Sequence, residues 1–340
     1  MSSTDKRNAM VPPRPTIRDI ARAAGVSPTA VSFALNNRPG VSEDTRERII
    51  AIAQELGFTP SSAARALSRS RAGAVGLVVG RAARDFAEER FFFHFIVGVE
   101  RALARRGLSF VFHAASSEDD ELATYATWWS ERRVDGVILL DARENDPRPA
   151  LLAHHSIPTV VAGEKLGYGA AVVSDEEGLI STVIDHLASI GTARVGYVSG
   201  PAHLAHTQRR LAAFTELTAR AGMVGLSLPA EDYTQEAGRA AVGELAGVDA
   251  MIFDNEILAL GGMRRMTEAG LDIPADVAVI SLEDSHLCGV MVPPITAVRR
   301  DPADFGEHCA DLMVEVLAGH EVADRREGVP EIIERASTIR

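Results

Sequence analysis

The sequence predicts a small all-α unit followed by an α/β core of two doubly wound parallel-sheet lobes. The first 60 residues hold three short helical patterns separated by Gly, Ser and Pro. From Gly73 onward, short apolar runs alternate with longer amphipathic stretches, and this alternation occurs in two series. Fully apolar strands between helices are typical of parallel sheets that helices cover on both faces. Two series therefore indicate two lobes.

Residues 16–36, with the sequence TIRDIARAAGVSPTAVSFALN, predict two helices joined by a tight turn. Thr16 can cap the first helix, and Gly25 suits the turn because it tolerates a left-handed backbone. Ser27 followed by Pro28 can start the second helix. The residues left near its exposed or leading face are Pro28, Thr29, Ser32, Phe33 and Asn36. This pattern is typical of the helix-turn-helix that places its second helix in the major groove of DNA, although an ordinary helical hairpin is the alternative.

A third helix is expected to begin at a Ser42 cap and to end at Gly57. Residues 61–71 then contain good helix formers but only one large apolar residue, Leu67. Such a segment is too short to be a stable helix by itself. It is interpreted as a linker that folds only when held, for instance against DNA and a second copy of the chain. A plain flexible linker is the alternative.

The charge distribution separates the two parts of the chain. The formal net charge is −12, yet residues 1–72 hold eleven Lys and Arg against six Asp and Glu, a net of +5 that leaves −17 for the remainder. A basic head on an acidic body predicts that only the head approaches phosphates, whereas a merely solvated tail is the alternative.

Other features of the sequence limit the class of protein. The N-terminal residues MSSTDKRNAMVPPRP lack the apolar core of a signal peptide, so a disordered tail is expected. No apolar run approaches the ~20 residues of a membrane span. Cys288 and Cys309 have no metal or redox spacing, which favours a reduced, cytoplasmic protein.

These patterns predict the domain boundaries. Ile295–Val298 is expected to cross between the lobes, and a helix over Pro302–Leu317 to pack on the first lobe. The predicted ranges are a tail at 1–13, a helix-turn-helix domain at 14–60, a hinge at 61–72 and a core at 73–340, whose first lobe takes about 73–165 plus 300–320 and whose second lobe takes about 166–294 plus 321–340.

A ligand site is expected beyond the carboxyl ends of the strands, because ligands of parallel α/β sheets bind there. Carboxylates, Asn and Arg beside an aromatic wall suit a neutral polyol. Acids and Asn after strands also cap helices, which is the structural alternative. The candidate effector-binding residues are Arg81, Phe91, Phe92, Asp141, Asp175, Arg210, Asp254, Asn255 and Glu283.

Signals for catalysis or cofactors are weak. The sequence has no GxSxG motif and no P-loop, and Gly167-Tyr168-Gly169 lacks the last glycine of a dinucleotide fingerprint. His203 and His206 are spaced i, i+3 without a local third metal ligand. We therefore expect no enzyme activity, no cofactor and no metal.

The chain resembles the lactose-repressor family (LacI/GalR type) along its whole length. TIRDIARAAGVS, the VS-x-x-LN pattern at Val31–Asn36, VSEDTRERI and LGFTPSSAARAL are similar to its head piece, and HLASIGTARVGYVSGP and PPITAV to its core. The resemblance implies a transcription regulator, expected to be a repressor, that binds a palindromic operator as a homodimer. It also implies a periplasmic-binding-protein-like core that holds a small, sugar-like effector. A small-molecule binding protein without a DNA role is the alternative.

The resemblance also suggests roles for individual residues. Leu67 matches the hinge leucine that wedges into the minor groove, and Arg210 and Glu283 match effector contacts. The chain has Ala30 and Phe33 where the family usually has Thr and Arg, so the operator sequence does not carry over. The predicted DNA-contacting residues are Thr16, Ser27, Pro28, Thr29, Ala30, Ser32, Phe33, Asn36, Ala64 and Leu67.

Overall fold

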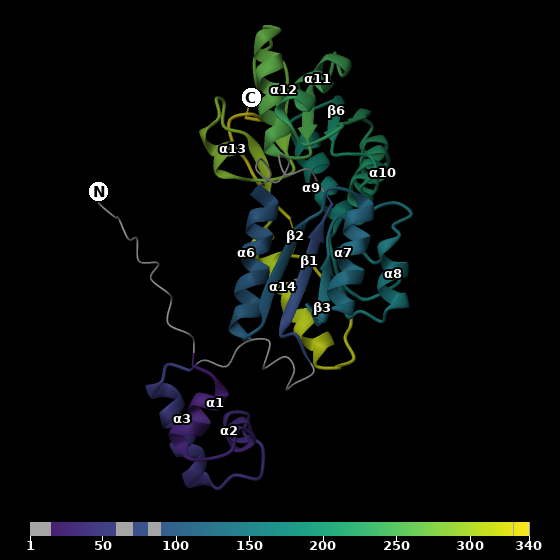
Figure 1. The fold of residues 1–340 in the computed structure, drawn as a ribbon. Helices are drawn as coiled ribbons and strands as arrows, with labels where there is room; N and C mark the ends of the chain where they lie inside the picture. The colour runs from purple at the N-terminus through teal and green to yellow at the C-terminus, as the bar shows by residue number, and fades with distance from the viewer. Residues whose placement is uncertain (1–14, 59–70, 81–89, 329, 340) are drawn as a thin grey trace, which may run out of the picture. The chain divides into compact units, whose positions relative to one another are not determined.

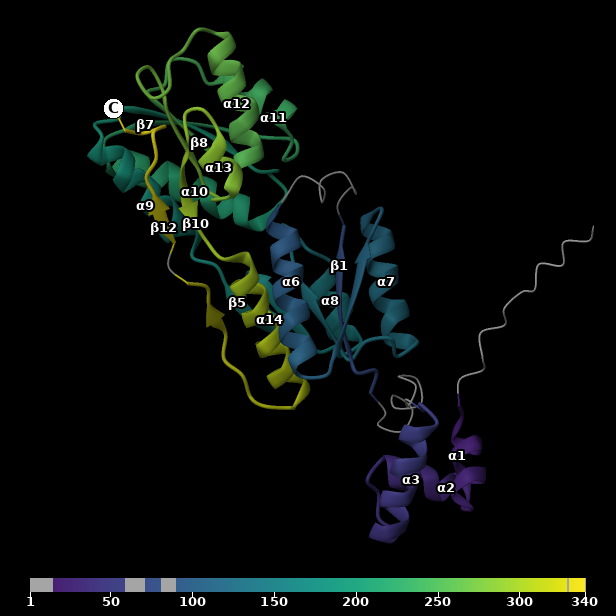
Figure 2. The same ribbon diagram turned by 90° about the vertical axis from the view of Figure 1, so that its left-hand side faces the viewer.

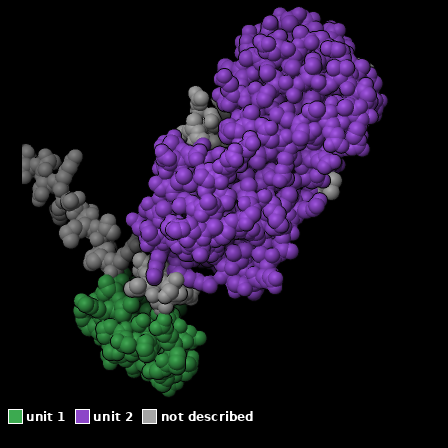
Figure 3. Space-filling view, turned by 90° about the vertical axis from the view of Figure 1, so that its right-hand side faces the viewer, with its two compact units in different colours: residues 1–70 green, residues 71–340 purple. Residues whose placement is uncertain are grey.

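A computed structural model describes residues 15–58, 71–80, 90–328 and 330–339. The chain divides into two compact units, residues 1–70 and residues 71–340 (Figure 3). Three of the predicted site residues, Ala64, Leu67 and Arg81, lie outside the described residues, and so does most of the predicted hinge.

Unit 1 contains the predicted helix-turn-helix. Thr16 and Asp19 form the expected capping box, with the Thr16 backbone amide 2.9 Å from the Asp19 carboxylate. Ile20, Val31 and Ile49 are fully buried and hold the three helices together. The prediction for Ser42 was wrong in detail, because its hydroxyl donates to Thr45 Oγ1 at 2.8 Å and makes no side-chain cap. The helices are α1 (Ile17–Ala24), α2 (Pro28–Leu35) and α3 (Glu43–Glu55).

The first lobe of unit 2 is built on a six-stranded sheet in the order β11-β5-β4-β3-β1-β2, with all neighbours parallel. Figures 1 and 2 show α6 and α14 on one face of this sheet, with α7 and α8 on the other. Its elements are β1 (Ala74–Val79), α6 (Arg90–Arg105), β2 (Ser109–Ala114), α7 (Glu118–Ser130), β3 (Gly136–Leu139), α8 (Arg148–His154), β4 (Thr159–Gly163), β5 (Ala170–Val173), α14 (Pro302–Leu317) and β11 (Arg325–Arg326).

The second lobe repeats the architecture with a sheet in the order β12-β10-β9-β8-β6-β7, in which only β12 is antiparallel to its neighbour among the described strands. Two separate apolar clusters cover its two faces. Its elements are α9 (Glu176–Ser189), β6 (Arg194–Ser199), α10 (Ala205–Arg220), β7 (Val224–Pro229), α11 (Gln235–Glu244), β8 (Ala250–Phe253), α12 (Glu256–Glu268), β9 (Ala278–Ser281), α13 (His286–Val290), β10 (Thr296–Arg299) and β12 (Glu331–Ile333). The predicted fold class is confirmed.

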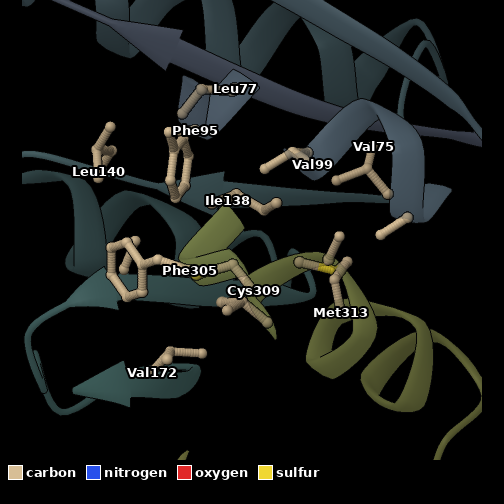
Figure 4. Packing of buried hydrophobic residues seen from close by; sticks show 14 of the residues in the cluster. Val75, Leu77, Phe95, Val99, Ile138, Leu140, Val172, Phe305, Cys309 and Met313 are labelled. Carbon is tan, nitrogen blue, oxygen red and sulfur yellow. The ribbon is translucent and has the colours of Figure 1, made fainter. Parts of the chain in front are cut away.

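The first-lobe core depends on close packing of α6 against α14. The rings of Phe95 and Phe305 lie 5.6 Å apart, tilted by 54° to each other, in the buried cluster of Figure 4. A Cβ at Gly98 would lie 1.9 Å from the Ala303 carbonyl oxygen, and one at Gly306 would lie 2.3 Å from that of Phe95. The two glycines therefore let the helix backbones approach each other, as the apolar faces of both helices require.

Two short strands differ from the predicted lobe boundaries, and one edge strand was not predicted. Residues 170–173 and residues 325–326 were both predicted to belong to the second lobe. In the structure they form β5 and β11, which are neighbouring strands of the first-lobe sheet. Residues 224–229 form an edge strand that the sequence did not reveal, because its residues are mostly exposed and lack a continuous apolar run. Only six residues join β4 to β5, so no helix marks the connection, and Gly169 adopts φ +83° within contact distance of Thr159.

Three crossovers connect the lobes. The first runs from β5 to α9, the second from β10 to α14, and the third from β11 to β12. The expectation that residues 295–298 themselves cross between the lobes was wrong: residues 296–299 form β10 of the second sheet, and the chain enters the first lobe only after it, at α14. Multiple crossing segments at one edge are typical of a hinge.

Candidate effector pocket and DNA-recognition helix

Helix α2 exposes the N-terminal part of the face that was predicted to contact DNA. Val31 and Ala34 are buried against the other helices, whereas Ser27, Pro28 and Thr29 are exposed. The other predicted DNA-contacting residues of α2 and its C-terminal end, Ala30, Ser32, Phe33 and Asn36, are half-buried. Thr16 is exposed at the start of α1. The small polar side chains at the N-terminal end of α2 are the part of the unit suited to base edges in a major groove.

Local hydrogen bonds fix the ends of α2. Ser27 Oγ accepts from the Ala30 amide at 3.1 Å, which caps the N-terminus, and the Asn36 side chain donates to the Ser32 carbonyl at 2.8 Å. Arg46 of α3 donates to the carbonyl of Ala34 at 3.2 Å. The Phe33 ring lies so close to Gly40 that a Cβ there would be 3.2 Å away, so Phe33 is also a packing residue of the turn after α2.

An inner pocket lies between the two lobes of unit 2 and measures about 610 Å³, counting the part open to solvent. Its first-lobe side is formed by Phe91, Phe92, Leu140, Asp141, Ala142, Ala162, Gly163, Glu164 and Phe305. Its second-lobe and crossover side is formed by Ser174, Glu176, His206, Arg210, Tyr233, Asn255, Glu283 and Arg300.

Arg210 is the centre of the second-lobe wall. It is 5% exposed, and its Nε lies 2.6 Å from Glu176 while its Nη1 lies 3.0 Å from Asp254. Tyr197 and Tyr233 donate to the Asp254 carboxylate at 2.5 and 3.1 Å. Burial would raise the pKa of Glu176, but Arg210 and Arg300 outweigh it and hold that pKa at about 2. The carboxylates and the guanidinium are therefore charged and mutually satisfied.

A second guanidinium joins all three crossovers. Arg300 follows β10, and its Nη2 lies 2.5 Å from Glu327, which follows β11. The same nitrogen lies 3.2 Å from Ser174 Oγ and 3.7 Å from Glu176, both after β5. Ser174 in turn donates to Glu327 at 2.6 Å. One buried cation thus holds the crossovers together at the base of the inner pocket.

The first-lobe wall supplies a carboxylate with an unused oxygen. Glu164 is 4% exposed and pairs through Oε2 with Arg209 of the other lobe, yet no hydrogen bond reaches its buried Oε1 from the described part of the chain. Burial raises the pKa of Glu164, an effect that Arg209 opposes. Nearby, the Ala205 amide donates to the Ala142 carbonyl at 2.8 Å and links the lobes directly.

The loop that carries Asp141 is held by a buried arginine. Arg148 has no exposed surface and donates to the carbonyls of Leu140 and Asp141 at 2.9 and 2.7 Å. It also pairs with Glu121 and Asp146. Asp141 adopts φ +53°, a conformation uncommon for residues other than glycine, so the surrounding bonds determine where its side chain lies.

Two further titratable groups of the pocket, Glu283 and His206, tend toward their neutral forms. Burial raises the pKa of Glu283 to about 8, and the nearby Glu256 carboxylate adds to this rise. Burial, together with the nearby Arg210 cation, lowers the pKa of His206 to about 4. The His206 Nε2 lies 3.2 Å from the Tyr233 hydroxyl. Neutral acids, imidazoles and phenols can exchange hydrogen bonds with hydroxyl groups at little cost in desolvation.

The structure brings together six of the predicted effector residues: Phe91, Phe92, Asp141, Arg210, Asn255 and Glu283 line the inner pocket. Asp254 lies behind Arg210 as its buried partner. Asp175 lies elsewhere: its carboxylate caps α9 by accepting from the Gly178 amide at 2.9 Å, and it lines a separate hollow.

Sequence reasoning missed several pocket residues. Glu176 is not among the candidate residues, yet it directly follows Asp175, the N-cap of α9, and lines the pocket. His206 and Tyr233 belong to no recognisable sequence motif. Arg300 directly follows Arg299, the last residue of β10, and the sequence does not show which of the two arginines faces the pocket. The rule that ligands bind at strand ends could have identified Arg300 and Ser174, because both follow strands directly.

Comparison with known proteins agrees with both units. Residues 16–61 match the family described as bacterial regulatory proteins, lacI family, and residues 184–338 match a periplasmic binding protein-like domain. The HTH-type transcriptional regulator CelR of Thermobifida fusca is 32% identical over 318 residues, which cover 90% of this chain and 93% of that protein. The ribose operon repressor of Escherichia coli (strain K12) is 26% identical, with 95% and 99% covered.

Solved structures show the same arrangement. The transcriptional regulator CelR–cellobiose complex has a TM-score of 0.72 at 28% identity and covers 95% of this chain and 100% of that chain. The lac repressor dimer bound to operator and an anti-inducer has a TM-score of 0.85 at 22% identity, with 96% and 100% covered, which establishes the shared fold. In the described ranges, no helix is both long and apolar enough to cross a membrane.

The head unit is thus matched by a family of DNA-binding regulators, and a regulator above 30% identity aligns with nine-tenths of the chain. The predicted resemblance is confirmed: this protein belongs to the lacI family of bacterial regulatory proteins and is a helix-turn-helix transcriptional regulator.

Proposed function

We propose that the protein is a cytoplasmic repressor that binds a palindromic operator as a homodimer and whose operator affinity a small sugar changes. It acts through binding alone, without catalysis or a cofactor. The observation that carries the proposal is the inner pocket, whose walls come from both lobes and whose lining combines two phenylalanines with carboxyl, amide, imidazole and phenol groups. Such a lining suits the hydroxyl groups and the ring face of a sugar.

The relatives support this choice of ligand. The CelR structure holds cellobiose, and the repressor from Escherichia coli is named for the ribose operon. The chain shares most of its length with both proteins, so its pocket is built on the same framework. We propose that Arg210, Asn255, Asp141, Glu283 and Phe91 contact the effector.

The DNA side of the proposal depends on α2. We propose that Ser27, Thr29, Ser32 and Asn36 contact the operator, with Pro28, Ala30 and Phe33 beside them and Thr16 near a phosphate. The exposure of the N-terminal end of α2 supports these contacts. Leu67, with Ala64 one helical turn before it, is proposed to enter the minor groove when operator is bound.

Regulation follows from the position of the pocket. A ligand that contacts both lobes stabilises the lobe arrangement in which those contacts are complete. The first lobe continues directly into residues 61–72, so its position determines where these segments of a dimer can meet. Effector binding then changes operator affinity to the extent that it favours one arrangement over the other.

The most direct test selects bound duplexes from random DNA with the full-length protein and repeats the selection with a panel of neutral sugars. The proposal expects enrichment of a two-fold symmetric sequence, affinity that falls steeply with rising salt, and a change in affinity with at least one sugar. Equal binding of selected and scrambled duplexes, with and without sugars, would refute it. Sugar binding without any duplex preference would favour a binding protein with no DNA role.

A further inference from the structure

A second cavity lies beside the inner pocket, near the N-terminus of α6. This outer compartment measures about 800 Å³, counting open solvent, and lies between Arg90 and His94 of α6 and the segment Asp284–His286 of the second lobe. It shares Phe91, Glu283 and Arg300 with the inner pocket. The two cavities are therefore neighbours on the two sides of the same three side chains, and both lie between the lobes.

The charges of the inner pocket select against anions. Its two buried guanidiniums are already engaged: Arg210 by Glu176 and Asp254, and Arg300 by Glu327. A phosphate would have to displace these carboxylates and would face Glu164 as well. The unused Glu164 Oε1 requires a donor, which a hydroxyl group supplies and an ionised phosphate does not.

Phe91 is placed to contact two linked rings. It lines both cavities, and its own ring is fixed because it stacks on Phe95 at 5.9 Å and meets Phe92 edge-on at 5.8 Å. An aromatic ring held in this way offers apolar surface to a sugar ring in the inner pocket and to another in the outer compartment. The outer compartment is lined by polar groups, among them His94, Ser285 and His286, which suit further hydroxyls.

We infer that the effector is an uncharged saccharide of at least two sugar units, one in the inner pocket and the next in the outer compartment, joined across Phe91. This inference rests on the proposed function, because it concerns the ligand of the same regulatory site. It excludes two otherwise reasonable classes of effector, a lone monosaccharide and a phosphorylated sugar.

Calorimetric titration of the full-length protein tests both halves of the inference. The ligands are glucose, galactose and ribose, the disaccharides cellobiose, maltose and lactose, the trisaccharides cellotriose and maltotriose, and glucose 6-phosphate. At least one disaccharide is expected to bind about ten-fold or more tightly than any of the monosaccharides, since a second ring adds contacts without a second loss of translational freedom. Glucose 6-phosphate is expected to bind no more tightly than glucose.

Variants of the outer compartment locate the second unit. His94→Ala removes a half-buried donor of that compartment and is expected to weaken the preferred disaccharide about three- to ten-fold while leaving monosaccharide affinity unchanged. His286→Trp places a large ring at an exposed position of the same compartment and is expected to abolish the preference for two units. His308→Ala is the matched control, because His308 is half-buried on α14 and lines neither cavity.

The outcomes separate the inference from the proposed function. A monosaccharide that binds as tightly as every disaccharide, or a disaccharide preference that survives both compartment variants, overturns the two-unit site while the sugar-regulated repressor stands. Tight binding of glucose 6-phosphate overturns the charge argument. If none of these sugars binds, whereas a symmetric duplex is still selected, the sugar effector of the proposed function has failed and the inference fails with it.

Discussion

Replacing Arg300 by methionine should destabilise the core strongly, because it breaks a buried ion pair from one side. The Arg300 side chain is 12% exposed and that of Glu327 is 9% exposed. The substitution removes two hydrogen bonds to Glu327, at 2.5 and 3.1 Å, and one to Ser174 at 3.2 Å. It leaves a carboxylate whose remaining hydrogen bond in the described residues comes from Ser174 Oγ. Removing one partner of such a pair costs about 3–5 kcal/mol of unfolding free energy.

The neighbouring residue provides a matched control. Arg299 belongs to the same strand end, but its pair with Glu331 spans 3.3 Å between side chains that are 58% and 67% exposed. Exposed pairs contribute about 0–1 kcal/mol, so Arg299→Met should change little. The double variant Arg300→Met, Glu327→Met should recover most of the loss, since an apolar pair can replace a buried ion pair at little cost.

Urea unfolding followed by the fluorescence of the two tryptophans, Trp128 and Trp129 of α7, measures these changes in the first lobe. Equal midpoints for Arg300→Met and Arg299→Met would refute the reasoning, because the burial of Arg300 would then have no energetic consequence. A double variant less stable than Arg300→Met would also contradict it, since the unpaired carboxylate could not be the source of the loss.

The remaining predictions concern other parts of the chain. Leu67→Ala should reduce both operator affinity and operator bending, measured by gel mobility with circularly permuted duplexes; unchanged bending would exclude the minor-groove wedge. Ser27→Ala should lower the unfolding free energy of the head unit by about 1 kcal/mol through loss of the α2 cap, as seen in its thermal transition. The folded-state pKa of Glu283, about 8, exceeds its ordinary 4.5, so its contribution to core stability is present at low pH and is lost as pH rises toward 8. Glu283→Gln should therefore flatten the decline in melting temperature between pH 4.5 and 8, and parallel curves for variant and parent would contradict this cause. Gly98→Ala should destabilise the core because its Cβ would meet α14 backbone, whereas Gly243→Ala, with open space around it, should be neutral or slightly stabilising in the same urea experiment.

The fold could be predicted from sequence because its signals are local. Apolar runs such as AVGLVV in β1 and AMIF in β8 alternate with amphipathic stretches, and this periodicity requires no knowledge of distant contacts. The exposure of the N-terminal end of α2 is also local, because the Ser27 cap and Pro28 begin the helix there while Val31 and Ala34 take the inner face. The rule that ligands bind beyond strand ends likewise selected Asn255 and Glu283, and Arg210 on the helix that follows β6. The position of these segments in a parallel sheet follows from chain order.

The pairing of charges could not be predicted, because it depends on contacts between distant segments. Arg299 and Arg300 are identical neighbours in sequence, yet only the second is buried and meets Glu327. Asp175 and Glu176 are both acids at the start of α9, but the first uses its carboxylate as the cap and the second reaches Arg210. In each pair the two residues are alike in type, so the position in the chain and the partners it meets decide which side chain enters the pocket.

The charge pairs also connect ligand binding to the hinge. From the Asp254 carboxylate, ion pairs lead through Arg210 and Glu176 to Arg300 and then to Glu327, so the pocket wall and the crossovers share one set of charges. A sugar that hydrogen-bonds to Arg210 or Glu176 changes how strongly each attracts its partners, and this alters the balance between lobe arrangements. Linkage is reciprocal, so if a sugar lowers operator affinity by some factor, saturating operator must lower sugar affinity by the same factor.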